Sequence, residues 1–258
     1  MSIYAYQLLK VMGLSEPRLL RVLSNVQFQL LEPDHVICRK GSRPDAFSHV
    51  LSGLIAAGMP DPDGTLAPLH IAGPGTWIGV NAILNPNEVG LETVCLTPVR
   101  LLVLPMVDAE EAFQNEPRFT QYLAQLMSWR NQLLTEKLAL MRLGSPQLRV
   151  VMGLALFAEA LHNGSSHLPA SEFDECQEIP LKQSLLASMC GVSRGIFSEC
   201  VQQLAAAGWI RLNYATLALS NVRAWHKFSS NYRCARHYEK LSMPEILRLM
   251  TAASESLI

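Results

Sequence analysis

The residues most suggestive of chemistry are the ten from Gly191 to Cys200, GVSRGIFSEC. Three apolar residues just upstream have the spacing of a short amphipathic helix: Leu185, Leu186 and Met189. Gly191 is placed to end that helix in a left-handed conformation, and Ser193 is placed to cap a second helix with its hydroxyl. Two helices joined by so short a turn are typical of a helix-turn-helix, which reads the major groove of DNA. The alternative is an ordinary helical hairpin.

The second of these helices has two distinct faces. Its apolar residues recur at helical spacing: Phe197, Cys200, Val201 and Leu204. Its other face is expected to meet the major groove: Arg194, Gly195, Ser198, Glu199 and Gln202. Arg194 can donate two hydrogen bonds to guanine, and Glu199 can accept one from the amino group of cytosine. Lys182, Gln183 and Ser193 lie where polar side chains at helix starts usually contact phosphates.

The charge of the chain is distributed unevenly. The formal net charge is −1, which by itself does not suggest a nucleic-acid partner. Between Val201 and Lys240, however, only Glu239 opposes six basic residues: Arg211, Arg223, Lys227, Arg233, Arg236 and Lys240. Such a local basic patch can supply the salt-dependent part of DNA affinity. The alternative is a solvated basic face without a partner.

Composition limits the other possibilities. A chain of 258 residues is long enough for one large domain or two ordinary ones. The hydrophobic fraction is 49%, but no apolar run approaches the roughly 18 residues of a membrane span, and the N-terminus lacks a secretory signal pattern. We therefore expect a cytoplasmic protein without a membrane association. The six cysteines show neither a CxxC pair nor zinc spacing, so we expect buried reduced thiols; a redox switch between Cys190 and Cys200 is the alternative.

The N-terminal part of the chain predicts strands, and the middle part predicts a long helix. Residues 20 to 107 contain short apolar runs separated by glycine and proline turns, which favours an antiparallel barrel. From Glu110 to Leu143 the pattern becomes helical, with one stripe wide enough to cover the barrel and also to meet a second subunit. The expected dimerisation residues are Leu123, Met127, Leu134, Leu138 and Met141. The alternative is a single broad face packed within one chain.

A hinge and a second domain are expected to follow. Helices do not run smoothly through Gly144-Ser145-Pro146, and Ser145-Pro146 is a good start for the next helix, LRVVMGLALFAEAL. After Trp225 the tail contains apolar residues at helical spacing, and we expect one or two amphipathic helices that pack on the second domain or on a partner.

Four segments in this order resemble the cyclic-AMP receptor protein and FNR (Crp/Fnr) superfamily of bacterial transcription regulators. They are LEPDHVICRKGSRPDAFSHVLSG, GPGTWIG, SPQLRVVMGLALFAEAL and PLKQSLLASMCGVSRGIFSECVQQLAAAGWI. The resemblance implies an α+β fold with a cyclic-nucleotide-binding-like antiparallel β-barrel (jelly roll), a long dimerisation helix and a winged helix-turn-helix. The corresponding domains are 1–109, 110–144, 145–225 and a helical extension, 226–258. The implied partners are double-stranded DNA with a palindromic site, a second copy of the chain, RNA polymerase and a small-molecule effector.

The chain departs from the family in the segment expected to bind the effector. The candidate pocket residues are Gly79, Val80, Asn81, Val89 and Gly90. Members that bind cyclic nucleotides carry a glutamate where Val80 stands and an arginine followed by serine or threonine where Val89-Gly90 stands. A buried cyclic phosphate would lack compensation here, so cyclic nucleotides are not the expected effector.

No cofactor, metal site or catalytic constellation is expected. The closely spaced N-terminal cysteines of the iron-sulfur members are missing, and no hydrolase or phosphate-loop motif is visible. Haem bound through His49 or His70 is the remaining cofactor possibility, weighed against a structural role for a histidine on a strand.

The recognition helix departs from the family as well. Better-known members follow the serine-arginine pair with glutamate and carry a basic residue four positions later, whereas this chain has Gly195 and Glu199. These residues favour either a different DNA site or a rival function. The rival is a protein-interaction module that kept the fold and lost sequence-specific DNA binding.

Overall fold

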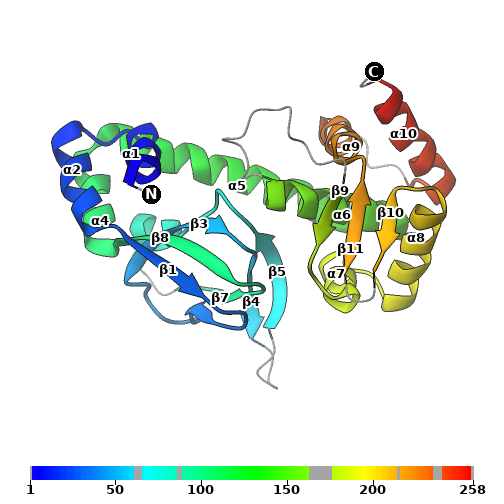
Figure 1. Ribbon diagram of the computed structural model, residues 1–258, viewed down its shortest axis with the longest axis horizontal. Coiled ribbons are helices and arrows are strands. Elements are labelled where there is room, and N and C mark those ends of the chain that lie inside the picture. Colours follow the sequence, from blue (N-terminus) through cyan, green and yellow to red (C-terminus); the bar gives the residue numbers. More distant parts are fainter. Residues whose placement is uncertain are drawn as a thin grey trace. The chain divides into compact units, whose positions relative to one another are not determined.

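The structure of the chain is a computed structural model, which describes residues 2–60, 66–85, 89–162, 176–213, 216–234 and 240–256. The chain forms two compact units, residues 1–132 and 133–258, and the helix α5 (Pro117–Leu143) contributes residues to both (Figure 1). Among the described residues, no helix combines the length and the apolar character needed to cross a bilayer.

The first unit is a pair of four-stranded antiparallel sheets with helices on one side. Its elements in chain order are α1 (Ser2–Val11), α2 (Glu16–Asn25), β1 (Gln27–Leu31), β2 (Val36–Cys38), β3 (Ala46–Ser52), β4 (Ile55–Pro60), β5 (Leu66–Ala72), β6 (Trp77–Ile78), α3 (Val80–Leu84), β7 (Glu92–Cys95), β8 (Val99–Pro105), α4 (Met106–Asn115) and the start of α5. The strand orders are β1-β8-β3-β6 and β2-β7-β4-β5. This arrangement confirms the predicted antiparallel β-barrel of the jelly-roll type.

Strand β8 shows why this unit has two apolar clusters. Successive side chains of a strand point to opposite faces, so a strand covered on both faces is apolar throughout. Leu101 and Val103 pack between the two sheets, whereas Leu102 and Leu104 pack under the helices. The cluster under the helices also includes residues of several helices, among them Leu9, Leu19, Phe119 and Leu123.

The predicted helix from Glu110 to Leu143 is interrupted, and that prediction was wrong in this respect. The chain forms α4, then leaves helical geometry at Glu116 and resumes with Pro117 as the first residue of α5. Proline lacks a backbone N–H and is tolerated at the first helical position, so it marks the start of a helix rather than its interior. The Thr120 hydroxyl donates to the Phe113 carbonyl at 2.7 Å and so bridges the break.

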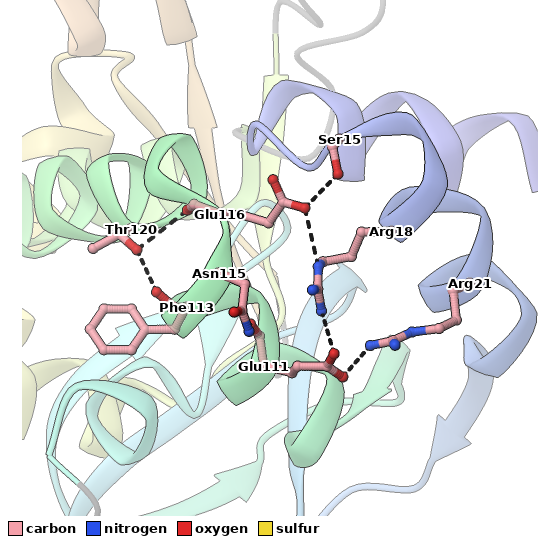
Figure 2. A network of polar contacts seen from close by, with 8 residues as sticks. All are labelled: Ser15, Arg18, Arg21, Glu111, Phe113, Asn115, Glu116 and Thr120. Atoms are coloured by element: carbon pink, nitrogen blue, oxygen red, sulfur yellow. Dashed lines mark hydrogen bonds and ion pairs between the residues drawn. The ribbon is translucent and has the colours of Figure 1, made fainter.

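A polar network fastens the break to the N-terminal helices (Figure 2). The Arg18 guanidinium contacts Glu111 at 3.0 Å and Glu116 at 3.1 Å, while Arg21 pairs with Glu111. The Ser15 hydroxyl donates to Glu116 as well. Paired guanidinium groups lower the pKa of the Glu111 carboxyl below its ordinary value. The network therefore fixes α2 against the junction between α4 and α5.

The second unit holds the remaining elements around a three-stranded antiparallel sheet. They are the rest of α5, α6 (Pro146–His162), β9 (Cys176–Ile179), α7 (Gln183–Met189), α8 (Arg194–Ala206), β10 (Ile210–Leu212), β11 (Leu217–Ser220), α9 (Val222–Cys234) and α10 (Met243–Glu255), with the strand order β10-β11-β9. After Trp225 the described residues include the rest of α9 and the whole of α10, in agreement with the predicted amphipathic helices. Helix α10 packs against α9, α6 and α8.

The predicted helix break at Gly144-Ser145-Pro146 is present, although the two compact units divide earlier, between Gln132 and Leu133, and the Ser145 hydroxyl makes two hydrogen bonds at the break. Helix α5 ends at Leu143 and α6 begins at Pro146. The Ser145 hydroxyl accepts a hydrogen bond from the Leu148 amide at 3.2 Å, which caps α6. The same hydroxyl donates to the Leu241 carbonyl at 2.6 Å. The segment before α10 is thereby tied to the start of α6.

A glycine in α6 allows close packing against the helix-turn-helix. A Cβ atom added at Gly153 would lie 2.4 Å from the Sγ atom of Cys190, which is fully buried. Glycine in a helix interior costs about 1 kcal/mol relative to alanine. Gly153 therefore lowers the helix propensity of α6, but it allows Cys190 at the end of α7 to pack directly against the α6 backbone.

We expect Gly153→Ala to destabilise the second unit by about 1–3 kcal/mol through overpacking, despite its better helix propensity. In a Cys190→Ala background the same substitution should be neutral or stabilising, because the nearest remaining atom, the Cys190 Cβ, lies 3.7 Å away. Native-state hydrogen exchange of the α6 and α8 amides measures both effects in a double-mutant cycle.

Gly195→Ala is the matched control, because its added Cβ would meet only the Ser193 Oγ at 3.9 Å. That variant should gain up to about 1 kcal/mol. If Gly153→Ala changes the exchange rates by the same factor with Cys190 present and with Cys190→Ala, the packing argument is contradicted.

Candidate nucleic-acid interface

The turn between α7 and α8 has the hydrogen bonds of a glycine-terminated helix. Gly191 has a φ of +63°, a conformation that glycine adopts without strain. The Gly191 amide donates to the Ser188 carbonyl at 3.0 Å, and the Val192 amide donates to the Ala187 carbonyl at 3.1 Å. These two bonds define a Schellman motif and turn the chain sharply into α8.

Ser193 begins α8 as the sequence predicted. Its backbone is extended, and its side chain accepts a hydrogen bond from the Ile196 amide at 3.3 Å. Two helices joined by a short turn are therefore present, and the β10-β11 hairpin follows them. This is the helix-turn-helix and wing arrangement expected from the sequence.

The two faces of α8 agree with the helical spacing. The buried residues are Phe197, Cys200, Val201 and Leu204. On the other face Arg194, Gly195, Glu199 and Gln202 are exposed and Ser198 is partly exposed. The Glu199 carboxylate accepts a hydrogen bond from the Gln203 side chain at 3.3 Å, one turn further along. The exposed face therefore presents a guanidinium, a carboxylate and amides, with open space at Gly195.

The residues expected to contact phosphates lie near the starts of the two helices. Lys182 precedes α7 and Gln183 is its first residue, and both side chains are exposed. The basic patch predicted further along is only partly exposed. Arg211, Arg223 and Lys240 are exposed, whereas Lys227 donates to the Ser256 carbonyl at 2.8 Å. The Arg233 side chain and Arg236 lie outside the described residues.

Arg149 supports the turn and was missed in the sequence. It lies on α6, and its guanidinium donates to the Gly191 carbonyl at 2.9 Å. A side chain from a preceding helix thus holds the residue that ends α7. The only sequence signal was a single arginine in an apolar helical stretch, which does not indicate what the side chain contacts.

The thiols beside the turn are buried rather than reactive. Burial raises the pKa of Cys190 to about 12 and that of Cys200 to about 11. A thiol is nucleophilic only as its thiolate, so both groups stay protonated and unreactive at neutral pH. This favours the packing interpretation of the two cysteines over the redox switch.

The five candidate effector residues do not form one surface. Gly79 precedes α3 with a φ of +93°, and a Cβ there would lie 2.9 Å from the Ala46 carbonyl oxygen. Val80 is buried in the apolar cluster under the helices, whereas Asn81 is exposed on α3. The Val89 amide donates to the Ser42 carbonyl at 3.0 Å, and Gly90 is exposed.

The two histidines considered for haem have different surroundings. His49 is 3% exposed, and its ring centroid lies 4.7 Å from that of Trp77 and 6.3 Å from that of Tyr4. His70 is exposed on β5. Across the described ranges, no three His, Cys, Asp or Glu side chains group as metal ligands would.

The five candidate dimerisation residues share one face of α5, but the chain itself covers part of that face. Leu123 is fully buried under the barrel, so its assignment to a subunit contact was wrong. Met127 packs against the same cluster. The Met141 methyl group lies where a Cβ on Gly191 would be. Leu134 and Leu138 remain 55% and 61% exposed.

Comparison with known proteins agrees with this architecture. Residues 28–116 match the family model of the cyclic nucleotide-binding domain. The CRP-like cAMP-activated global transcriptional regulator of Mycobacterium tuberculosis is 22% identical over 187 residues, which cover 72% of this chain and 81% of the relative. The relatives are transcription regulators, not enzymes.

Solved structures share the fold over most of the chain. FixK2 of Bradyrhizobium japonicum has a TM-score of 0.64 at 13% identity, covering 78% of this chain and 96% of that one. The c-di-GMP responsive regulator CLP of Xanthomonas campestris has a TM-score of 0.57 at 18% identity, covering 80% and 99%. A CRP/FNR family regulator of Thermus thermophilus has a TM-score of 0.51 at 22% identity, covering 79% and 98%.

These matches extend through the barrel, the long helix and the small-sheet region that carries α7 and α8. The chain therefore shares the fold of these solved regulators, and its residues 28–116 form a domain of the cyclic nucleotide-binding family.

Proposed function

We propose that this protein is a homodimeric regulator that binds a palindromic DNA site through α8 under the control of an effector other than a cyclic nucleotide. The observation that carries the proposal is the exposed polar face of α8, at the end of a turn built by Gly191 and Ser193. The apolar side of the same helix is fully used by the core. Its other side is free to enter a major groove, which admits one α-helix.

The open space at Gly195 supports an approach from outside the molecule. No contact within the described part of the chain requires a glycine there, since an added Cβ would touch only the Ser193 Oγ, at 3.9 Å. Glycine nevertheless weakens the first turn of α8 by about 1 kcal/mol relative to alanine. A helix that must bring its backbone close to DNA has a reason to keep this residue.

The rival proposal is an interaction module that has lost sequence-specific DNA binding. The acidic Glu199 on the exposed face favours it, because a carboxylate repels phosphates. Glu199 can also accept a hydrogen bond from the amino group of cytosine. The exposed face of α8 is therefore compatible with DNA reading as well as with a protein partner. Selection of bound sequences from a random DNA library distinguishes them.

We expect Arg194→Ala and Lys182→Ala to weaken DNA binding in different ways. Loss of a two-hydrogen-bond guanine contact should cost about 1–3 kcal/mol on the selected site and relax the preference at one position in each half-site. Loss of a phosphate contact should weaken all sequences alike and reduce the salt slope by about one. Titrations of selected and scrambled DNA across a salt series measure both effects.

Gln203→Ala serves as the control, because Gln203 is exposed on α8 and its side chain is bonded to Glu199 rather than free to reach a base. The half-sites in the selected DNA should lie about one helical turn apart. An equal loss of affinity for both DNAs in Arg194→Ala would show that Arg194 does not read a base, and the rival function would then lead.

Dimerisation is proposed to use the part of α5 that the chain leaves uncovered. Leu134 and Leu138 are one turn apart on the same face, and burying two leucines against a second copy would stabilise a coiled-coil-like seam. Charged residues at both positions should yield folded monomers in sedimentation equilibrium. Gln125→Glu is the control, since Gln125 is exposed about half a turn away around the same helix. A double variant that sediments as a folded dimer would refute this seam.

Cyclic AMP and cyclic GMP are expected not to bind with a dissociation constant below about 100 μM, which corresponds to about 5.5 kcal/mol. Val80 is buried in the apolar cluster and Gly90 has no side chain, so neither can bind the ribose or the phosphate. Isothermal calorimetry with the full chain checks this, and saturable binding at lower concentrations would show that other residues replace the missing donors. A contact with RNA polymerase and a cytoplasmic location remain expectations from the family resemblance.

A further inference from the structure

The wing, which is the hairpin of β10 and β11, is joined at its base to α8 and α9. The Ser220 amide at the end of β11 donates to the carbonyl of Trp209, which lies between α8 and β10, at 2.9 Å. The Trp225 indole Nε1 on α9 donates to the Ser220 carbonyl at 3.0 Å. The two indole rings meet edge to face, with centroids 6.4 Å apart. These contacts determine how the wing lies relative to α8.

Asn221 connects the wing to α9 in a left-handed backbone conformation. It follows the last residue of β11 and precedes the first residue of α9, and its φ is +54°. Its carbonyl accepts a hydrogen bond from the Ala224 amide at 2.9 Å, in the first turn of α9. Glycine and asparagine are the residues that adopt this conformation most readily. Glycine would satisfy the backbone equally well, so the asparagine is expected to make a further contact through its side chain.

Helix α10 supplies that contact. The Asn221 Nδ2 atom donates to the Ser254 hydroxyl at 2.7 Å, across 33 residues of sequence. Close by in the chain, the Lys227 ammonium on α9 donates to the Ser256 carbonyl at the end of α10 at 2.8 Å. A cation bound to the last carbonyls of a helix stabilises that end. The C-terminal end of α10 is therefore tied both to the base of the wing and to α9.

The rest of α10 is fixed by a cap and by apolar packing. The Ser242 amide donates to the Glu245 carboxylate at 2.8 Å as part of a capping box, and the preceding Leu241 carbonyl is bonded to Ser145. Helix α10 packs against α6, α8 and α9 (Figure 1). Its buried residues are Met243, Ile246, Met250 and Ala253. One helix therefore connects the start of α6, the helix α8 and the base of the wing.

We propose that α10 is a brace that holds the wing in one orientation relative to α8, and that Asn221 is the positioning residue through which it acts. The proposal rests on the proposed function only in using DNA affinity as one of its two readouts. Arg211 is exposed on β10, so the orientation of the wing determines where this guanidinium lies relative to a DNA backbone bound by α8. Asn221 and Ser254 act on DNA binding through Arg211 and need not contact DNA themselves.

The first test measures hydrogen exchange of the β10 and β11 amides in the full-length protein without DNA. Asn221→Gly keeps the left-handed conformation and removes the amide, whereas Ser254→Ala removes its acceptor. Exchange of these amides should become about twofold to tenfold faster in each variant, because a hydrogen bond at the base of the wing is lost. The two changes remove the same bond, so the double variant should exchange no faster than the faster single variant.

Thr251→Ala is the matched control, because the Thr251 hydroxyl is exposed on the same helix and donates to the Leu247 carbonyl of α10 itself, at 2.9 Å. It should leave exchange in the wing unchanged. Ser254→Thr keeps a hydroxyl group and should retain the wild-type rates. Circular dichroism of each variant shows that it is folded, and Ser254→Ala keeps the test valid if Asn221→Gly is not.

The second test uses DNA binding to separate a positioning role from a loss of stability. Ser254→Ala should weaken binding of selected DNA about twofold to tenfold. This loss should disappear in an Arg211→Ala background, because the contact that the brace positions is already absent. A general loss of stability would weaken binding by the same factor in both backgrounds.

Three outcomes would overturn the inference: unchanged exchange of the wing amides in both variants, an equal acceleration by Thr251→Ala, or the same loss of DNA affinity with Arg211 and with Arg211→Ala. A wild-type protein that prefers no DNA sequence would refute the proposed function instead. The exchange measurements would then still decide whether α10 braces the wing.

Discussion

The architecture depends on one constraint, which is that α5 must belong to two hydrophobic cores in succession. Up to Gln132 its residues are part of the first unit, where Phe119 and Leu123 are buried under the barrel. From Leu133 onward they are part of the second unit, where Leu140 is buried. The buried residues of α5 therefore pack in the core of the first unit near its start and in the second unit near its end. The apolar face therefore changes its partner along its length, and the uncovered stretch around Leu134 and Leu138 is where that change occurs.

Both ends of α5 are fixed by interactions that do not depend on apolar burial. At its start, the carboxylates of Glu111 and Glu116 are bound by arginines of α2, and Thr120 bridges the break from α4. At its end, Gly144 and the capped start of α6 stop the helix. Polar contacts have strict geometry, so they set where the helix begins and ends, while the cores set which face is buried.

Patterns with strong local causes could be predicted from the sequence. Helix caps, glycine turns and short apolar runs between turns follow from the residues themselves, and so the turn at Gly191, the cap at Ser193 and the barrel were all predictable. The break at Glu116 was not, because the amphipathic stripe continues through it and only Pro117 marks the interruption. Leu123 and Leu134 have the same residue type on the same face, and only the tertiary structure shows that one is covered and the other exposed. Arg149 and Gly153 act through contacts 37 or more residues away in sequence, to which local periodicity is insensitive.

The bond between Ser145 and the Leu241 carbonyl has a consequence for the order in which the protein is made. It joins residues 96 positions apart, and α10, which packs on α9, α6 and α8, follows it in the chain. Contacts of long sequence separation form late, and domains fold as units while the chain leaves the ribosome. The first unit can complete its core once α5 has emerged. The unit that carries α8 is complete only when residues up to Glu255 have been made. Each new chain therefore passes through a period in which its barrel is folded while α10 does not yet pack against α6, α8 and α9.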